Sequence, residues 1–162
     1  MAELTPLEEK LAEVLGLAQA AAKVTDDVAK LVEEDEQRAL LDKMSQEARE
    51  TASRAEEVAS SRDGRKTAIL DKARETKQEL QEMADSYLGG EDVDALDGFE
   101  FLSMAEAGEL AHVEVIEKIN ETARDRDIEE LVRFVKPIQE RHVGDVRETA
   151  LALAAEEAEE EQ

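Results

Sequence analysis

Residues 99–119 read FEFLSMAEAGELAHVEVIEKI, and their apolar side chains recur at the three- and four-residue spacing of an α-helix with one buried face. That face comprises Phe99, Leu102, Ala105, Val113 and Ile116. Winding the segment at about 100° per residue places Glu109 at the centre of the apolar face, with Glu106 and His112 to either side. An ionised carboxylate that leaves water needs a cation, a hydrogen-bond donor or a metal. The segment therefore predicts a helix with a polar cluster on its buried side.

The other histidine of the chain has a similar setting. His142 lies at the centre of the apolar stripe of the last helical segment, and Gln139 and Asp145 flank it. Glu47, in the QEARET sequence of residues 46–51, lies at the edge of the stripe of an earlier segment. We therefore expect groups from three helices to meet inside the protein.

The remaining sequence predicts further helices and no strand. Thr5-Pro6-Leu7-Glu8 combines a capping residue, a proline at the first helical position and a glutamate of a capping box. Acidic residues 33–36 separate this first helix from a second, which ends at the SSRDG sequence of residues 60–64, and Gly89-Gly90 ends a third. Residues 97–100 and 127–130 resemble capping sequences for a fourth and a fifth helix. The prediction is an all-α bundle.

Composition limits the classes of function. The 162 residues predict one domain over residues 1–155, followed by an acidic frayed tail over residues 156–162. A formal charge of −23 disfavours binding to nucleic acids and anionic lipids. No apolar run is long enough to span a membrane, and there is no cysteine, so we expect a cytoplasmic protein that does not bind membranes.

The polar cluster has two interpretations. In the first, Glu109, His112 and His142 bind a transition metal such as Fe, Mn or Zn, and Glu106 and Glu47 complete or tune the site. In the second, a carboxylate and an imidazole form a buried hydrogen bond that joins the last two helices. A single Glu-x-x-His match is common in a chain so rich in glutamate.

The layout of residues 10–155 resembles the ferritin-like superfamily, and in particular its YciE/YciF-type bacterial branch, which is associated with stress responses. The resemblance rests on Glu47 in QEARET, on Glu106 and Glu109 in EAGELAHVE, and on His142 in PIQERHVGD. It implies an up-down bundle of four long helices with a crossover helix, a metal site between the helices and a homodimer. Ala18 and Gln19 occupy the region where the family carries a glutamate on the first helix, so a complete di-iron centre is not expected.

Two functions follow from these observations. The chain is either a ferritin-like bundle that binds a transition metal through a reduced ligand set, or a non-catalytic helical scaffold or interaction protein that has lost the metal site. No phosphate-binding loop or catalytic triad is recognisable, so we expect no enzymatic activity.

Overall fold

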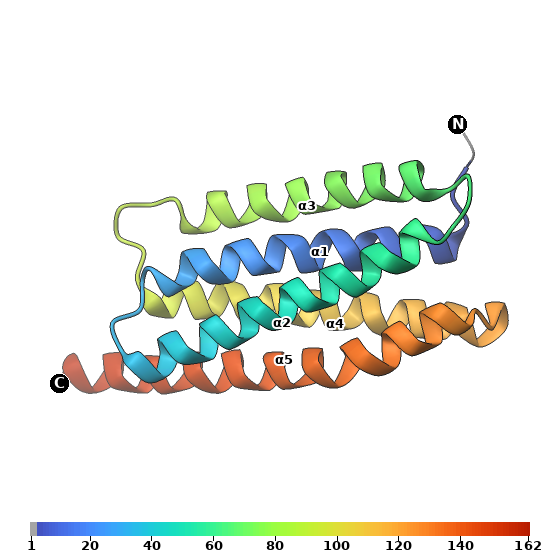
Figure 1. Cartoon of the computed structure of the whole chain (residues 1–162). Coiled ribbons are helices and arrows are strands. Elements are labelled where there is room, and N and C mark those ends of the chain that lie inside the picture. Colours follow the sequence, from blue (N-terminus) through green and yellow to red (C-terminus); the bar gives the residue numbers. More distant parts are fainter. Residues whose placement is uncertain (1–2) are drawn as a thin grey trace.

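The computed structural model describes residues 3–162 as five α-helices with no strand, which confirms the all-α prediction (Figure 1). The helices are α1 (Pro6–Ala29), α2 (Asp35–Ser60), α3 (Lys66–Leu88), α4 (Ala95–Ala123) and α5 (Arg126–Glu160). None of these helices is long and apolar enough to cross a membrane.

Helix α1 makes the most extensive contacts of the five helices. It packs against α2, α3 and α4, while α5 packs along α4 and also contacts α2 (Figure 1). Helices α1, α2, α5 and α4 therefore enclose a common interior, and α3 lies on the outer side of α1. This position explains why α1 is buried over most of its surface and carries runs of alanine, leucine and valine.

Two large apolar clusters fill most of the interior, and Ala21, Ala22 and Ala48 form a third, smaller one. One large cluster contains Leu11 and Leu15 of α1 with Ile116 and Ile128, and the other contains Phe99 with buried side chains of α1, α2 and α5. Along α4, the buried residues change from Leu102 in the second cluster to Val113 in the first. The residues between these positions are the ones predicted to form the polar cluster.

Helix α3 packs closely against α1 at Gly16. A Cβ atom built on Gly16 would lie 2.3 Å from the carbonyl oxygen of Ala73 and 2.9 Å from Cβ of Thr76, so only glycine fits there. With 23 residues α3 is the shortest of the five helices, although it is only one residue shorter than α1. Ile69, Ala73, Thr76, Leu80 and Ala84 give α3 a continuous buried stripe, which explains its length.

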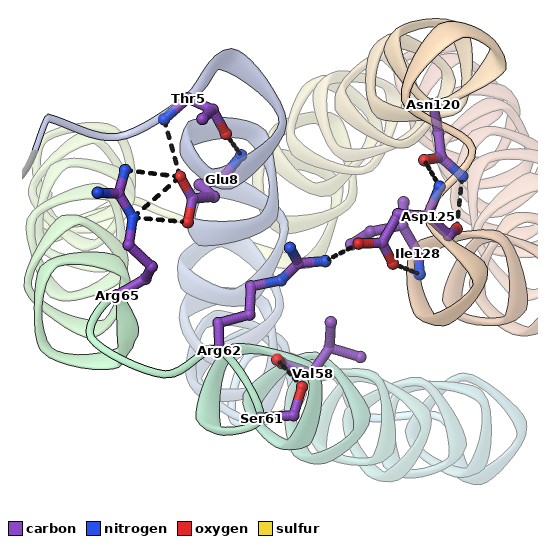
Figure 2. Close-up of polar contacts among 9 residues, drawn as sticks. All are labelled: Thr5, Glu8, Val58, Ser61, Arg62, Arg65, Asn120, Asp125 and Ile128. Carbon is purple, nitrogen blue, oxygen red and sulfur yellow. Dashed lines mark hydrogen bonds and ion pairs between the residues drawn. The ribbon is translucent and has the colours of Figure 1, made fainter.

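Ion pairs and caps join the helix ends at one end of the bundle (Figure 2). The predicted capping box is present: the Thr5 hydroxyl accepts from the Glu8 amide, and the Glu8 carboxylate accepts from the Thr5 amide at 2.9 Å. Arg65, which precedes α3, donates to the same carboxylate from Nε at 2.9 Å. Arg62 of the α2–α3 turn pairs with Asp125 (Figure 2).

Two predicted helix starts were wrong. The residue that caps α4 is Asp94, which exchanges hydrogen bonds with Asp97, and the residue that caps α5 is Asp125, which accepts from the Ile128 amide at 3.1 Å. In both cases the earlier aspartate is the N-cap. The side chain of Asn120 also holds the backbone of Asp125 through two hydrogen bonds of 2.9 Å, and so fixes the α4–α5 turn.

The C-terminal tail also differs from its prediction. Helix α5 continues to Glu160, so most of residues 156–162 is helical, although each of them is exposed. On α3, Met83 is 61 % and Tyr87 is 42 % accessible, although their spacing continues the apolar stripe of Ile69 and Leu80. Ala84 is buried in their place, because α3 turns that neighbouring face toward α1.

Candidate functional site

Five polar side chains lie between the two apolar clusters. Glu106 and Glu109 belong to α4, Gln139 and His142 belong to α5, and Glu47 belongs to α2. All are buried except Glu47, which is half-buried; Glu106 and His142 are each only 2 % exposed. We call these five residues the polar layer.

Helical spacing alone explains how the layer is positioned. On α5, Val135, Gln139, His142 and Val146 recur at intervals of four, three and four residues and form one buried face. Leu102, Glu106, Glu109 and Val113 do the same on α4. Each helix therefore brings a polar pair to the interior without interrupting its apolar stripe.

His142 has a carboxylate on each side of its ring. Its Nε2 lies 3.1 Å from Oε1 of Glu47, and its Nδ1 lies 3.8 Å from Oε1 of Glu106. Burial lowers the pKa of His142, but Glu106 and Glu47 more than offset this effect, so the pKa lies above its usual value of 6.5. The geometry therefore favours a protonated imidazolium, with one ring N–H directed toward Glu47 of α2 and the other toward Glu106 of α4.

Glu106 is the best-satisfied acid of the layer. The Gln139 amide donates to the Glu106 backbone carbonyl at 3.1 Å and also to the Glu106 carboxylate. Burial raises the pKa of Glu106, but its contacts with His142, Glu109 and Gln139 outweigh this effect and lower the pKa. Glu106 is therefore the ionised partner of His142.

Glu109 behaves differently from its neighbour. Its pKa is raised well above 4.5, first by burial and then by the negative charge of Glu106. Its Oε2 atom is buried and has no hydrogen-bond partner. A cavity of about 10 Å³ touches Glu109 together with Thr51 and Gln139, which is close to the volume that holds one water molecule. Burial and the charge of Glu106 therefore favour the neutral form of Glu109, which lies beside a small internal space.

The first helix contributes only apolar groups to this space. Val14, Leu17 and Ala18 line the cavity from α1. The buried carboxylate of α1 is Glu8, which lies in the first turn of the helix and pairs with Arg65. The α1 side of the cavity therefore offers only hydrocarbon.

His112 makes its polar contacts elsewhere. Its Nδ1 lies 2.8 Å from the carbonyl oxygen of Gly108, and its Nε2 lies 3.3 Å from Oε2 of Glu13 on α1. Its side chain is 36 % exposed, so the expectation that it faces the core was wrong. His112 lies against α1, where it pairs with the Glu13 carboxylate. The same carboxylate also pairs with Nζ of Lys10 at 2.7 Å.

Two further side chains take part in these contacts and were not predicted from the sequence. Arg141 donates to the Glu47 carboxylate from α5, and Glu13 pairs with His112 from α1. Arg141 directly precedes His142, so its position next to an inward histidine could have indicated that it reaches the same carboxylate. Glu13 gave no such signal, because its role depends on how α1 and α4 are rotated against each other.

The arrangement does not fit a metal ion as it stands. Within residues 3–162, no three side chains of His, Cys, Asp or Glu are grouped so that they could hold a metal. A metal-bound imidazole must present a ring nitrogen without a proton. Both ring nitrogens of His142 face carboxylates instead.

A groove also lies between α4 and α5, outside the polar layer. It has a volume of about 740 Å³ and is lined by α4 residues from Glu117 onward and by α5 residues from Glu129 to Glu140. It includes none of the five residues of the layer.

Comparison of the chain with protein-family models, curated proteins and solved structures finds no match.

Proposed function

We propose that the protein is a non-catalytic helical scaffold with a ferritin-like helix arrangement, in which the polar layer has a structural role. The observation that carries this proposal is that His142 lies between the carboxylates of Glu47 and Glu106. The layer thus joins α2, α4 and α5 by mutual hydrogen bonds. The hairpins α1–α2 and α4–α5, with α3 between them in sequence, support the ferritin-like part of the proposal. The lack of cysteine is consistent with a cytoplasmic location.

The proposal predicts a large difference between the two histidines. His142→Gln should lower the free energy of unfolding by about 3 kcal/mol, because it leaves the buried Glu106 carboxylate without its cation. His112→Gln is the matched control and should cost less than about 1 kcal/mol, because that pair is partly exposed. Chemical denaturation at neutral pH measures both values. Equal effects would contradict a structural role for the layer.

Metal analysis completes this test. After aerobic purification the protein should carry no stoichiometric metal, and adding Fe(II), Mn(II) or Zn(II) should leave the melting temperature unchanged. A saturable rise in melting temperature that His142→Gln abolishes and His112→Gln preserves would overturn the scaffold proposal.

Binding of a transition metal is the second candidate function, and one observation favours it. The Oε2 atom of Glu109 is buried without a partner, beside the carboxylate of Glu106. Glu106, Glu109 and His142 are the side chains that would hold a metal, with Glu47 next to them, provided that His142 gave up one of its carboxylate partners. A bound cation would favour the ionised form of Glu109 beside the carboxylate of Glu106. Glu109→Gln distinguishes the candidates, because only the second predicts that it abolishes a metal-dependent rise in melting temperature.

A further inference from the structure

The dipeptide Asp-Gly occurs twice in the chain, and the structure places the two copies in different surroundings. Asp63-Gly64 lies in the turn between α2 and α3, whereas Asp97-Gly98 lies near the start of α4. An aspartate that precedes glycine can react through its side-chain carboxyl group with the next main-chain amide, because glycine has no Cβ atom to shield that amide. The two copies can therefore be compared as reaction sites within one molecule.

The copy in the α2–α3 turn is open to solvent. The Arg65 amide donates to the Arg62 carbonyl at 3.1 Å, so Asp63 and Gly64 are the central residues of a turn. Both are exposed, Gly64 has a φ of 76°, and a Cβ atom built on it meets no atom within 4 Å. No hydrogen bond within residues 3–162 engages the Gly64 amide or the Asp63 carboxylate. The two groups that would react are therefore free to approach each other.

The copy in α4 is protected. The Gly98 amide donates to the Asp94 carbonyl at 3.1 Å, and the Asp97 carboxylate accepts from the Asp94 amide at 3.0 Å. Gly98 is buried, and a Cβ atom built on it would lie 2.7 Å from a methyl carbon of Val28. Reaction at Asp97 would therefore require the first turn of α4 to open, and each opening costs free energy.

We propose that Asp63 is a modification site at which the folded chain spontaneously converts aspartate to isoaspartate, and that Asp97 is not. This inference goes beyond the proposed function, since it holds whether or not the polar layer binds a metal.

The reaction needs only water and the two neighbouring residues. The Gly64 amide nitrogen attacks Cγ of the protonated Asp63 carboxyl group, the N–Cγ bond forms, and the hydroxyl group leaves with the amide proton as water. The product is a five-membered succinimide. Water then adds to the main-chain carbonyl carbon of Asp63 and breaks the bond from this carbon to the Gly64 nitrogen. The chain now continues through the former side chain, the former main-chain carbonyl is a carboxylate, and the mass is unchanged.

Isoaspartate would change the turn that positions the start of α3. It adds one carbon atom to the main chain between Arg62 and Arg65, so the hydrogen bond that closes the turn cannot keep its geometry. Arg62 pairs with Asp125 at the α4–α5 turn, and Arg65 pairs with Glu8 of α1 (Figure 2). Both ion pairs depend on this turn, so isomerisation should loosen this end of the bundle.

Incubation of the intact folded chain in mildly acidic buffer, which favours the protonated carboxyl group, tests the assignment. Peptide mapping by mass spectrometry locates isoaspartate, and an isoaspartate-specific methyltransferase quantifies it. Asp63 should isomerise at least about tenfold faster than Asp97, because only Asp97 reacts through local opening. In guanidinium chloride, which exposes both copies, the two rates should become similar. Equal rates in the folded chain, a faster reaction at Asp97, or no isoaspartate at either position would overturn the proposal.

Asp63→Glu is the matched variant for the structural consequence. It keeps the charge and the exposed position, but glutamate would have to form a six-membered ring, which closes much more slowly. After the same incubation, the unmodified chain should contain a population with a lower melting temperature, in proportion to its isoaspartate content. Asp63→Glu should not develop this population. If the fraction that carries isoaspartate melts like the fresh chain, the inferred loosening of this end of the bundle is wrong.

Discussion

Glu8 is a buried carboxylate that links two helices at one end of the bundle. It accepts from the Thr5 amide and from Arg65, so it closes the capping box and also attaches α1 to the start of α3 (Figure 2). These contacts, the Arg65 hydrogen bonds above all, lower its pKa from 4.5 to about 2. Glu8 is therefore ionised in the folded chain well below the pH at which it becomes protonated in the unfolded chain.

The stability that Glu8 supplies should depend on pH. Because its folded pKa is the lower one, this contribution is present above pH 4.5 and is lost as the pH falls toward about 2. Glu8→Gln should lower the free energy of unfolding at neutral pH by about 2 kcal/mol, which is less than the full linkage value because Arg65 is partly exposed. The Glu8→Gln variant should also lose less stability than the unmodified chain as the pH falls from 4.5 to 2. Urea unfolding across this range measures both effects.

Glu9→Gln is the control for this experiment, since Glu9 is the exposed neighbour of Glu8. If Glu8→Gln and Glu9→Gln retained the same acid sensitivity as the unmodified chain, the ion pair with Arg65 would not be the cause.

Residue spacing was enough to predict most of the polar layer. Glu47, Glu106, Glu109 and His142 were identified from where they fall on helical stripes, and the structure brings them together. His112 was not predictable in this way, because a residue at the edge of a stripe faces the core or a neighbouring helix according to how the helices are rotated. Whether the layer binds a metal remains a prediction.

At the scale of helices, the contact between α1 and α3 depends on Gly16. Gly16→Ala should lower the free energy of unfolding by about 2 kcal/mol, because the added methyl group meets the backbone of Ala73, which cannot move without shifting α3. Gly144→Ala should raise it by up to about 1 kcal/mol, since alanine is the better helix former and the space there is open. Thermal melts of the two variants should move in opposite directions. A stabilising Gly16→Ala would mean that α3 does not pack this closely.

Helix boundaries were predictable where one capping candidate was present and less so where two were. Thr5 and Pro6 define the start of α1 as predicted. For α4 and α5 the sequence offers two aspartates each, and the structure uses the earlier one. In α5 the choice follows from tertiary contacts, since Arg62 and Asn120 both hold Asp125. Such contacts cannot be inferred from the local sequence.

The molecule as a whole carries a charge of −23, and this charge should make its stability depend on salt. Many of the ion pairs among residues 3–162 join side chains three or four positions apart and are exposed, so these pairs offset little of the repulsion among 43 acidic side chains. Raising NaCl from low to molar concentration should raise the melting temperature by about 5 °C or more, because screening weakens that repulsion. KCl should act equally. An effect confined to one cation would indicate specific binding instead of screening.

The number and order of helices were predictable because every turn contains an acidic, glycine-rich or polar interruption that the helical stripes do not cross. The side of α1 on which α3 lies was not predictable, since it depends on the space in front of Gly16.

The position of the polar layer also bears on the order of events during folding. Contacts within the α1–α2 and α4–α5 hairpins join neighbouring segments of the chain, whereas the contact between Glu47 and His142 closes a loop of nearly a hundred residues. Glu106 and His142 can pair as soon as α4 and α5 meet, but Glu47 reaches them only when the two hairpins dock. We therefore expect docking of the two hairpins to bury an imidazolium that is still hydrated, so that the docking barrier includes the cost of removing water from that group.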